Sequence, residues 1–593
     1  MAKRVSPMGS AVPKKVGRDL QRAGESANAV PHATETAREA ATPTIVARRS
    51  DAVRSVPSLG WWNAYFLGKL ALLWYGVIGL HPLENLAFAL VLLMPIRARW
   101  LARLRAAIAI PVAVALAYYD SWLPPFERLL AQASQVATFS LPYMIEIAGR
   151  FVSWSAVIAV VAAVAAYASV AKRVRVGVVV VSLLGGLAVA ERAPRHAADR
   201  PAVVSGSEAK LVAAGVVLPT ADPETDLDTL LTNHFETEAT RRVRFNRPAA
   251  GAVPFDLVLL HVCSLSWDDL QVTGLDQHPL FARFDILLTR FNAAASYSGP
   301  AVIRLLRAPC GQTNHTNLYA PTQEHCYLLP ALRQAGFEPE LVMNHDGHFD
   351  DFLGIVRNQG AQGIKPMSIT GLPIPQRGFD GSPIFDDAAV LARWADSRES
   401  GSVPRVAAIY NTISLHDGNQ LTSDRVRRSS KGTYKIRLEK VLDDLEQFIT
   451  RMEASGRRMV IALVPEHGAA IRGDKMQIAG MREIPTPAIT LVPVGIKVIG
   501  QNSKRAGPPV QIDAPTSHLA LAHIMARILE QSPFERPAFE AQDYVAALPG
   551  TRYVAENAGM VMAQRGHRYF MRMPKDGWNE YLGSPFVQTR GSQ

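Results

Sequence analysis

The sequence predicts an α/β protein in two parts: an N-terminal multi-span α-helical membrane domain, then a domain with a mostly parallel sheet covered by helices on both faces. Hydrophobic residues make up 48% of the 593 residues and charged residues only 19%, whereas about 25% is usual in soluble proteins. Long apolar runs fill residues 58–191. After residue 252, short apolar runs alternate with helical patterns, which is typical of a parallel sheet.

The positive charge of the chain is confined to its first third. Residues 1–200 hold 23 Lys and Arg against 11 Asp and Glu, a net charge of +12, so the remaining residues carry −1 of the total of +11. Basic residues beside apolar runs follow the positive-inside rule of membrane proteins. A nucleic-acid-binding face would need a basic patch on the folded domain, so no nucleic-acid partner is expected.

The N-terminal part divides into a tail and a transmembrane domain. Residues 1–57 are predicted to be a disordered basic cytoplasmic tail, because they show no apolar periodicity and no signal-peptide segment. Residues 58–191 are predicted to form about five membrane helices. The apolar runs are Trp61–Leu80, Asn85–Ile96, Ala106–Trp122, Phe151–Ala171 and Val176–Ala190. A span needs about 20 residues, and the second and fifth runs are short.

Two basic clusters set the predicted topology. If the tail, Arg97–Arg105 and Lys172–Arg175 all lie inside, five spans satisfy every cluster. An odd number of spans places the residues after about 192 outside the cytoplasm. If the second run were instead a buried or re-entrant helix, the number of spans would no longer be odd. Lys69 must snorkel or face other helices, and residues 123–147 are compatible with an interfacial amphipathic helix.

The remaining chain is read as a linker, 192–252, and a large domain, 253–593. The linker contains one expected helix, Asp226–Thr240. The expected strands are Phe255–Val262, Pro339–Met343, Val406–Tyr410, Met459–Val464 and Ile489–Val494. The expected helices are Pro300–Arg307, Asp386–Arg398, Tyr434–Ser455 and Ser517–Leu529. Sites in such folds form at the carboxyl ends of the strands.

Polar residues follow several of these strands. Cys263 follows the first, Glu466 and His467 follow Met459–Val464, and His416 follows Val406–Tyr410. A thiolate, an imidazole and a carboxylate suit Zn²⁺, with a serine oxygen as fourth ligand. Taken singly, Cys263 fits a buried structural thiol equally well, and Glu466-His467 fits a surface turn.

Ser298 precedes Gly-Pro and a helical run, which makes it a helix N-cap candidate. The alternative is a nucleophile, activated by a base or a metal at a helix start that favours anions. Cys310 and Cys326 lie sixteen positions apart and can form a disulfide outside the cytoplasm. In a reducing compartment all three cysteines would instead be unpaired.

Several motifs together resemble those of the BcsG family, the inner-membrane phosphoethanolamine transferases of bacterial cellulose synthesis. They are HVCSLSWDD, FNAAASYSGPAVIRLLRAPCGQTNHTNLY, YNTISLHDGN, VPEHGAAIRGDKMQIAGMREIPTP and VPVGIKV. The resemblance covers the chain after about Asp256 and implies an alkaline-phosphatase-like fold with zinc in a periplasmic domain. The N-terminal apolar helices also fit this family, but the tail is not covered.

The resemblance also implies roles for individual residues. The family's metal ligands match Cys263, Ser298, Glu466 and His467, and its nucleophile matches Ser298. Its supporting active-site residues match Tyr297, His416 and Arg482. Compared with the wider alkaline-phosphatase superfamily, a second metal set is missing; His345 and His348 are spare candidates but are better explained as loop or substrate-side residues. Trp267 and Trp394 are interpreted as core residues rather than sugar-stacking platforms.

The implied activity is transfer of phosphoethanolamine from phosphatidylethanolamine to glucose C6 hydroxyls of cellulose, through a serine intermediate. The implied partners are the lipid donor, the cellulose acceptor and cellulose synthase subunits in the inner membrane. Three alternatives remain: a hydrolase on the same fold, a transferase of another lipid head group, and a non-catalytic scaffold of the synthase complex.

Overall fold

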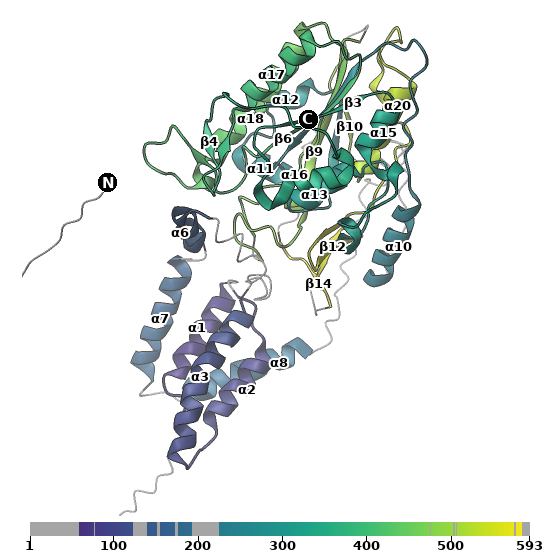
Figure 1. Cartoon of the computed structure of the whole chain (residues 1–593). Helices are drawn as coiled ribbons and strands as arrows, with labels where there is room; N and C mark the ends of the chain where they lie inside the picture. The colour runs from purple at the N-terminus through teal and green to yellow at the C-terminus, as the bar shows by residue number, and fades with distance from the viewer. Residues whose placement is uncertain are drawn as a thin grey trace, which may run out of the picture. The chain divides into compact units, whose positions relative to one another are not determined.

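The computed structural model describes residues 58–75, 78–121, 139–150, 154–171, 176–192, 225–474, 476–501, 505, 507–573 and 577–583 (Figure 1). The predicted disordered tail, residues 1–57, lies outside the described residues, as do most of the predicted linker and residues 122–138.

Each of the five predicted apolar runs overlaps a helix. These are α1 (Trp62–Trp74), α2 (Pro82–Leu93), α3 (Arg99–Tyr119), α7 (Trp154–Val170) and α8 (Val176–Arg192). Among the described helices, α3 is the one long and apolar enough to cross a membrane, while α2, Val157–Ser169 and Val176–Ala190 are shorter apolar helices. The helices are therefore confirmed, and the five-span topology stays a prediction.

Helix α3 begins earlier than its apolar run. The run was expected to start at Ala106, but the helix starts at Arg99 and includes Arg103 and Arg105. Arginine is a good helix former, so the basic cluster continues into the helix. A further helix, α6 (Leu141–Arg150), overlaps the segment expected to be amphipathic.

Lys69 faces other helices, one of the two options for a charge inside an apolar run. Its ammonium pairs with Asp120, and both side chains are almost fully buried. Lys69 also donates to Asn85 Oδ1 at 2.7 Å, and Asn85 donates to Asp120 Oδ2 at 2.8 Å. Nearby His81 contacts Asp120 Oδ1 at 2.8 Å. A buried polar network thus joins α1, α2 and the end of α3.

The large domain is built on a seven-stranded sheet in the order β10-β2-β9-β8-β1-β6-β3. Its strands are β1 (Asp256–Val262), β2 (Ile286–Asn292), β3 (Glu338–Met343), β6 (Val406–Thr412), β8 (Met459–Leu463), β9 (Leu491–Ile499) and β10 (Val510–Ile512). Strand β9 pairs antiparallel with both neighbours, and the other pairings are parallel. The prediction of a mostly parallel sheet is confirmed.

Two strands of this sheet were not predicted, and one was displaced. Strand β2 carries Thr289 and Arg290 within its apolar run, which obscures the pattern. Thr289 donates its hydroxyl proton to Asp513 Oδ1 at 2.6 Å, so the polar group is satisfied inside the fold. Strand β10 has only three residues. The run expected at Ile489–Val494 becomes β9, which begins two residues later and continues to Ile499.

Helices cover both faces of the sheet, as predicted (Figure 1). Helices α13 (Ser298–Leu306), α15 (Leu328–Gln334) and α20 (His518–Glu530) share one hydrophobic core with one face. Helices α11 (Trp267–Thr273), α17 (Asp387–Ser400) and α18 (Ser430–Ala454) share the core of the other face. Trp267 and Trp394 are each 2% exposed in that second core, which confirms their interpretation as core residues.

Smaller elements complete the described chain. The helical ones are α12 (Pro279–Arg283), α14 (His315–Leu318), η1 (Glu324–Cys326), η2 (Phe349–Asp351), α16 (Phe352–Val356), η3 (Arg357–Ala361), α19 (Pro487–Thr490) and α21 (Ala541–Val545). Strands β4 (Gln376–Arg377), β5 (Pro383–Ile384) and β7 (Gln420–Leu421) form a small antiparallel sheet.

A second antiparallel sheet lies near the C-terminus and was not predicted. It contains β11 (Val554–Asn557), β12 (Met560–Arg565), β13 (Arg568–Arg572) and β14 (Trp578–Glu580). The predicted linker helix is confirmed as α10 (Leu227–Thr240). Its Leu230 and Leu231 share a small core with β11 and β12, so this helix is packed against the folded domain.

Replacing Lys69 with methionine is expected to destabilise the N-terminal helices, because Asp120 would remain buried without its cation. Breaking a buried pair from one side costs about 3–5 kcal/mol, whereas replacing both partners is often neutral. Thermal unfolding of the full chain in detergent measures this effect. The double variant Lys69→Met/Asp120→Leu should recover much of the loss; equal melting temperatures for the single and double variants would contradict the buried pair.

Candidate metal and nucleophile site

The site lies where β1 and β8 end, because these two neighbouring parallel strands end at the same edge of the sheet. The pairing continues past the strands: Val464 N–H donates to Leu260 O and Glu466 N–H to Val262 O, both at 2.9 Å. Cys263 follows Val262 directly, and its N–H donates to Thr412 O at the end of β6. The backbone therefore places Cys263 beside Glu466 and His467, as the sequence predicted for the carboxyl ends of the strands.

The predicted ligand atoms come together at this edge. One ligand atom each from Cys263, Glu466 and His467 lies within 4.8 Å of the others. Cys263 Sγ is 4.0 Å from His467 Nε2 and 3.5 Å from Ser298 Oγ. His467 Nε2 is 3.7 Å from Glu466 Oε2. All four side chains thus surround one small space, and those of Cys263, Glu466 and His467 are fully buried.

The buried carboxylate of Glu466 shows that this space fits a cation. Its Oε1 accepts a hydrogen bond from Asn411 Nδ2 at 2.7 Å. Its Oε2 is buried and has no hydrogen-bond partner among the described residues. A buried carboxylate oxygen without a partner is costly. A divalent cation among a thiolate, an imidazole and this oxygen would satisfy it, and the donor set is the one that zinc prefers.

Without a metal, the protein environment disfavours the thiolate form of Cys263. Burial, together with the charge of Glu466, raises the pKa of the Cys263 thiol to about 12. Burial and the nearby Arg482 hold the pKa of His467 well below its usual value, so its imidazole is neutral. A metal needs both a deprotonated cysteine and a neutral histidine. His467 is therefore already in the neutral form that binds a metal. The positive charge of a bound ion would favour loss of the Cys263 proton.

Ser298 is the first residue of α13 and not its N-cap. The N-cap position is taken by Tyr297, which makes no side-chain capping bond. The hydroxyl of Ser298 instead lies against Cys263 Sγ. The capping interpretation is therefore wrong for this serine. Its position at a helix start, where backbone N–H groups are unpaired, suits an anionic group on its oxygen.

Arg482 and Tyr297 flank this group. Arg482 NH1 donates to Ser264 Oγ at 3.2 Å and lies 3.4 Å from His467 Nδ1. Its guanidinium stacks 5.3 Å above the centre of the Tyr297 ring. The Tyr297 hydroxyl donates to Glu483 Oε1 at 2.7 Å. A largely buried cation therefore lies next to His467 of the ligand group and over the residue that precedes Ser298.

His416 follows β6 and lies beside two aromatic rings that contact each other. Its ring centre is 5.4 Å from that of Phe379 and 6.4 Å from that of Phe349. Its Nδ1 is 2.7 Å from the backbone oxygen of Asp417. Burial, followed by the charge of Arg482, lowers the pKa of His416 to about 4. At neutral pH this imidazole is therefore uncharged.

The two spare histidines are not part of the ligand group. His345 is buried and its Nε2 donates to Asn411 Oδ1 at 2.8 Å. His348 is exposed and pairs with Asp346 and Asp380. The interpretation of both as loop residues agrees with these contacts.

Asn411 was not predicted as a site residue from the sequence. It connects His345 to Glu466 and also donates to His261 O at 3.1 Å. It lies on β6 beside β1, in register with His261. Its position near the end of a central strand is where site residues are expected. An asparagine at that position, however, does not reveal which side chain it contacts.

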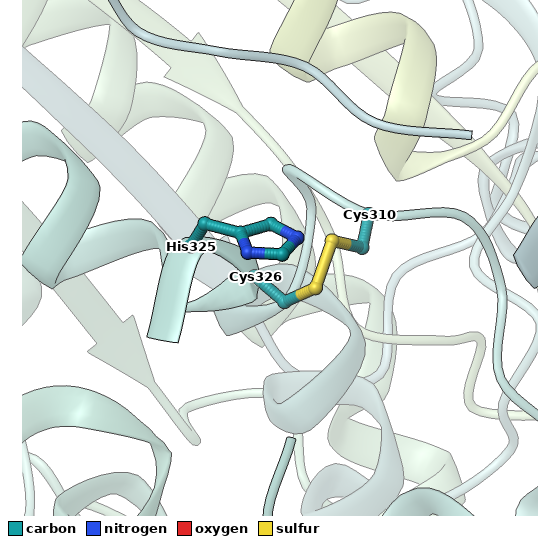
Figure 2. A group of neighbouring side chains, drawn as sticks. All are labelled: Cys310, His325 and Cys326. Atoms are coloured by element: carbon teal, nitrogen blue, oxygen red, sulfur yellow. A yellow bond between two sulfur atoms is a disulfide. The ribbon is translucent and has the colours of Figure 1, made fainter. Parts of the chain in front are cut away.

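Cys310 and Cys326 form a disulfide, as predicted for a domain outside the cytoplasm (Figure 2). His325 lies next to them, so these three residues also form a group with metal-ligand atoms. The two sulfur atoms are bonded to each other and offer no thiolate. Cys263 is consequently the free cysteine, available to the site at the sheet edge.

These features define a class: an α/β protein preceded by apolar helices, with a serine beside a buried cysteine-glutamate-histidine group. Family comparisons then identify the family. The models for the N-terminal and C-terminal domains of the cellulose biosynthesis protein BcsG match residues 62–189 and 215–578. The BcsG protein of Escherichia coli K12 is 41% identical over 541 residues, which cover 88% of this chain and 96% of that protein. The chain belongs to the BcsG family.

Comparison with solved structures gave partial matches of low sequence identity. One is an alkaline phosphatase superfamily protein from Vibrio parahaemolyticus, with a TM-score of 0.43 and 12% identity over 60% of this chain and 88% of that one. Another is the lipooligosaccharide phosphoethanolamine transferase A of Neisseria meningitidis, with a TM-score of 0.39 and 14% identity over 82% of this chain and 98% of that one.

Replacing Asn411 with alanine is expected to weaken binding of a metal at this site. The amide holds one oxygen of Glu466 in place, and the loss of such a partner typically costs 10–100-fold in metal affinity. Competition with a chelator measures the affinity of the purified full chain for zinc. Asn246→Ala is the control, because Asn246 makes the same kind of bond, to Glu530, at the surface. Equal zinc affinity in both variants would contradict this role.

Replacing Cys310 and Cys326 together with serine is expected to lower the stability of the domain. In the chain-entropy model, a loop of this length contributes about 3 kcal/mol. Thermal unfolding of the full chain, with and without a reductant, measures the loss. The wild type under reducing conditions should behave like the double variant. A wild-type melting temperature that does not respond to the reductant would contradict a stabilising disulfide.

Proposed function

We propose that this protein is a zinc-dependent phosphoethanolamine transferase of bacterial cellulose biosynthesis. It would move phosphoethanolamine from phosphatidylethanolamine to glucose C6 hydroxyls of cellulose, at the periplasmic side of the inner membrane. The observation that carries the proposal is the convergence of Ser298 with Cys263, Glu466 and His467 at one edge of the sheet. Membership of the BcsG family supports the link to cellulose.

Two further features support the proposed periplasmic location and the lipid donor. The disulfide suits an oxidising compartment, which agrees with a periplasmic domain. The apolar N-terminal helices, including α3, suit attachment to a membrane. An enzyme held at a membrane has direct access to a lipid donor, and contact with cellulose synthase subunits in the same membrane would supply the polymer.

Four residues are proposed to bind the metal: Cys263, Glu466, His467 and, through its oxygen, Ser298. Zinc bound there would supply a positive charge that lowers the pKa of the serine hydroxyl. Arg482 would pair with the oxygens of the phosphoryl group through its planar guanidinium. Tyr297 would hold that guanidinium by stacking beneath it.

The reaction is proposed to proceed in two displacements. In the first, Ser298 Oγ forms a bond to phosphorus and the bond from phosphorus to the diacylglycerol oxygen breaks. The serine proton passes to the neutral His416 and then to the diacylglycerol oxygen. In the second, a C6 hydroxyl oxygen bonds to phosphorus and the bond to serine breaks. His416 takes the hydroxyl proton and returns it to Ser298.

The serine intermediate provides the test of this proposal. Incubation of the zinc-loaded full chain with phosphatidylethanolamine, followed by peptide mass spectrometry, should show a phosphoethanolamine adduct on the Ser298 peptide. The adduct should be absent after chelation and in Ser298→Ala. Ser296→Ala is the control, because this buried serine lies two residues away and its hydroxyl has no partner among the described residues.

The other outcomes distinguish the alternatives. Release of free phosphoethanolamine without labelled cellulose would indicate a hydrolase. An adduct that forms only with another phospholipid would indicate a different head group. A zinc-loaded, folded protein that forms no adduct with any donor, and a Ser298→Ala protein that supports normal cellulose modification, would indicate a scaffold.

A further inference from the structure

Helix α6 has two distinct sides. Tyr143, Glu146 and Arg150 follow one another at helical spacing and contact the large domain. Leu141 and Ile145, on the other side, are exposed. A polar side that makes specific contacts and an apolar side without them are typical of an interfacial helix. Only three residues separate α6 from the apolar helix α7.

Arg150 makes a two-pronged contact with Asp417. Its NH1 donates to Oδ2 at 2.5 Å and its NH2 to Oδ1 at 2.9 Å. Both side chains are 16% exposed, so solvent screens the pair only weakly. The Tyr143 hydroxyl donates to the same carboxylate at 3.1 Å. Glu146 accepts from Arg150 NH2 at 2.7 Å and from the Ser430 N–H at 2.9 Å.

Asp417 is the neighbour of the proposed proton carrier. Its backbone oxygen lies 2.7 Å from His416 Nδ1, and its Oδ1 accepts from the Gly418 N–H. Burial alone would raise the pKa of Asp417, but the hydrogen bond and charge of Arg150 hold it well below its usual value. The carboxylate is therefore charged, and Arg150 fixes the turn that orients His416.

Two glycines make room for α6. Gly418 has φ +84°, and an added Cβ would lie 2.8 Å from Tyr143 Cζ. Gly480 has φ +85°, and an added Cβ would lie 2.5 Å from Arg150 NH1. Gly480 precedes Arg482 by two residues. The same guanidinium thus touches the two loops that carry His416 and Arg482.

We propose that Arg150 is a positioning residue: from the segment next to the apolar helices, it holds the loops of His416 and Arg482 in the arrangement that transfer requires. This inference rests on the proposed function, because it assigns His416 and Arg482 to the reaction. The site would then be complete only while α6 is docked on the large domain, which ties catalysis to the part of the chain beside the lipid donor.

The test compares full-chain variants in phospholipid vesicles with labelled phosphatidylethanolamine and a cello-oligosaccharide acceptor. Arg150→Met should lower kcat about 10–100-fold, since a small misplacement of reacting groups has effects of this size. The KM for the lipid should stay within about twofold, because the contact is not to the substrate. Arg150→Lys should recover part of kcat, because lysine keeps the positive charge but cannot form the bidentate contact with Asp417.

The matched control is Arg428→Met. Arg428 makes a similar bidentate contact with Asp424, at 3.0 and 2.6 Å, between β7 and α18, and its side chain is 45% exposed. It should leave kcat, zinc content and melting temperature unchanged. For Arg150→Met, zinc content should match the wild type, while the melting temperature should fall because Asp417 would stay largely buried without its cation. The kcat of this variant is therefore measured well below its own melting temperature.

Three results would overturn the inference: an unchanged kcat in Arg150→Met, a fall in kcat explained by lost zinc, or no recovery in Arg150→Lys. If Arg150→Met does not fold, Arg150→Lys and Tyr143→Phe decide the question. Tyr143→Phe removes one hydrogen bond to Asp417 and keeps the ring, and an unchanged kcat in both would refute the positioning role. Absence of transfer by the wild type would instead refute the proposed function.

Discussion

The parallel pairing of β1 with its two neighbours, β8 and β6, is the constraint on which the site depends. Hydrogen bonds continue past the end of β8, from Glu466 N–H to Val262 O, and the Cys263 N–H pairs with the end of β6. Cys263 and Glu466 therefore emerge side by side, although 203 positions separate them in the chain. A buried carboxylate oxygen without a hydrogen-bond partner is costly, and a cation shared with Cys263 would satisfy it.

The residues around this pair show how the remaining fold supports it. Asn411 on β6 holds one oxygen of Glu466, and Arg482 packs against Ser264 and the ring of Tyr297. The buried sheet supplies a rigid frame, so each polar side chain is fixed by a partner on a neighbouring strand or loop. Such rigidity suits the proposed transfer, in which a nucleophile and a phosphoryl group would have to be held in one geometry.

Much of this arrangement was predictable from sequence, because its signals are local. Apolar runs identified β1, β3, β6 and β8, and polar residues just after the strands identified Cys263, Glu466 and His467. The sequence could not reveal β2, whose Thr289 and Arg290 interrupt its pattern. Nor could it reveal that Arg150 reaches Asp417, 267 positions away, since a tertiary ion pair has no local signature. The resemblance to the BcsG family supplied the proposed roles of Tyr297 and Arg482, which spacing alone did not.

X-ray absorption at the zinc edge of the zinc-loaded full chain tests the central claim most directly, because it counts the atoms bound to the metal. Coordination by Cys263, Ser298, Glu466 and His467 predicts one sulfur at about 2.3 Å and three nitrogen or oxygen atoms at about 2.0–2.2 Å. The sulfur should disappear in Cys263→Ser. A zinc shell without sulfur, or with the same sulfur in that variant, would contradict the assignment of this site.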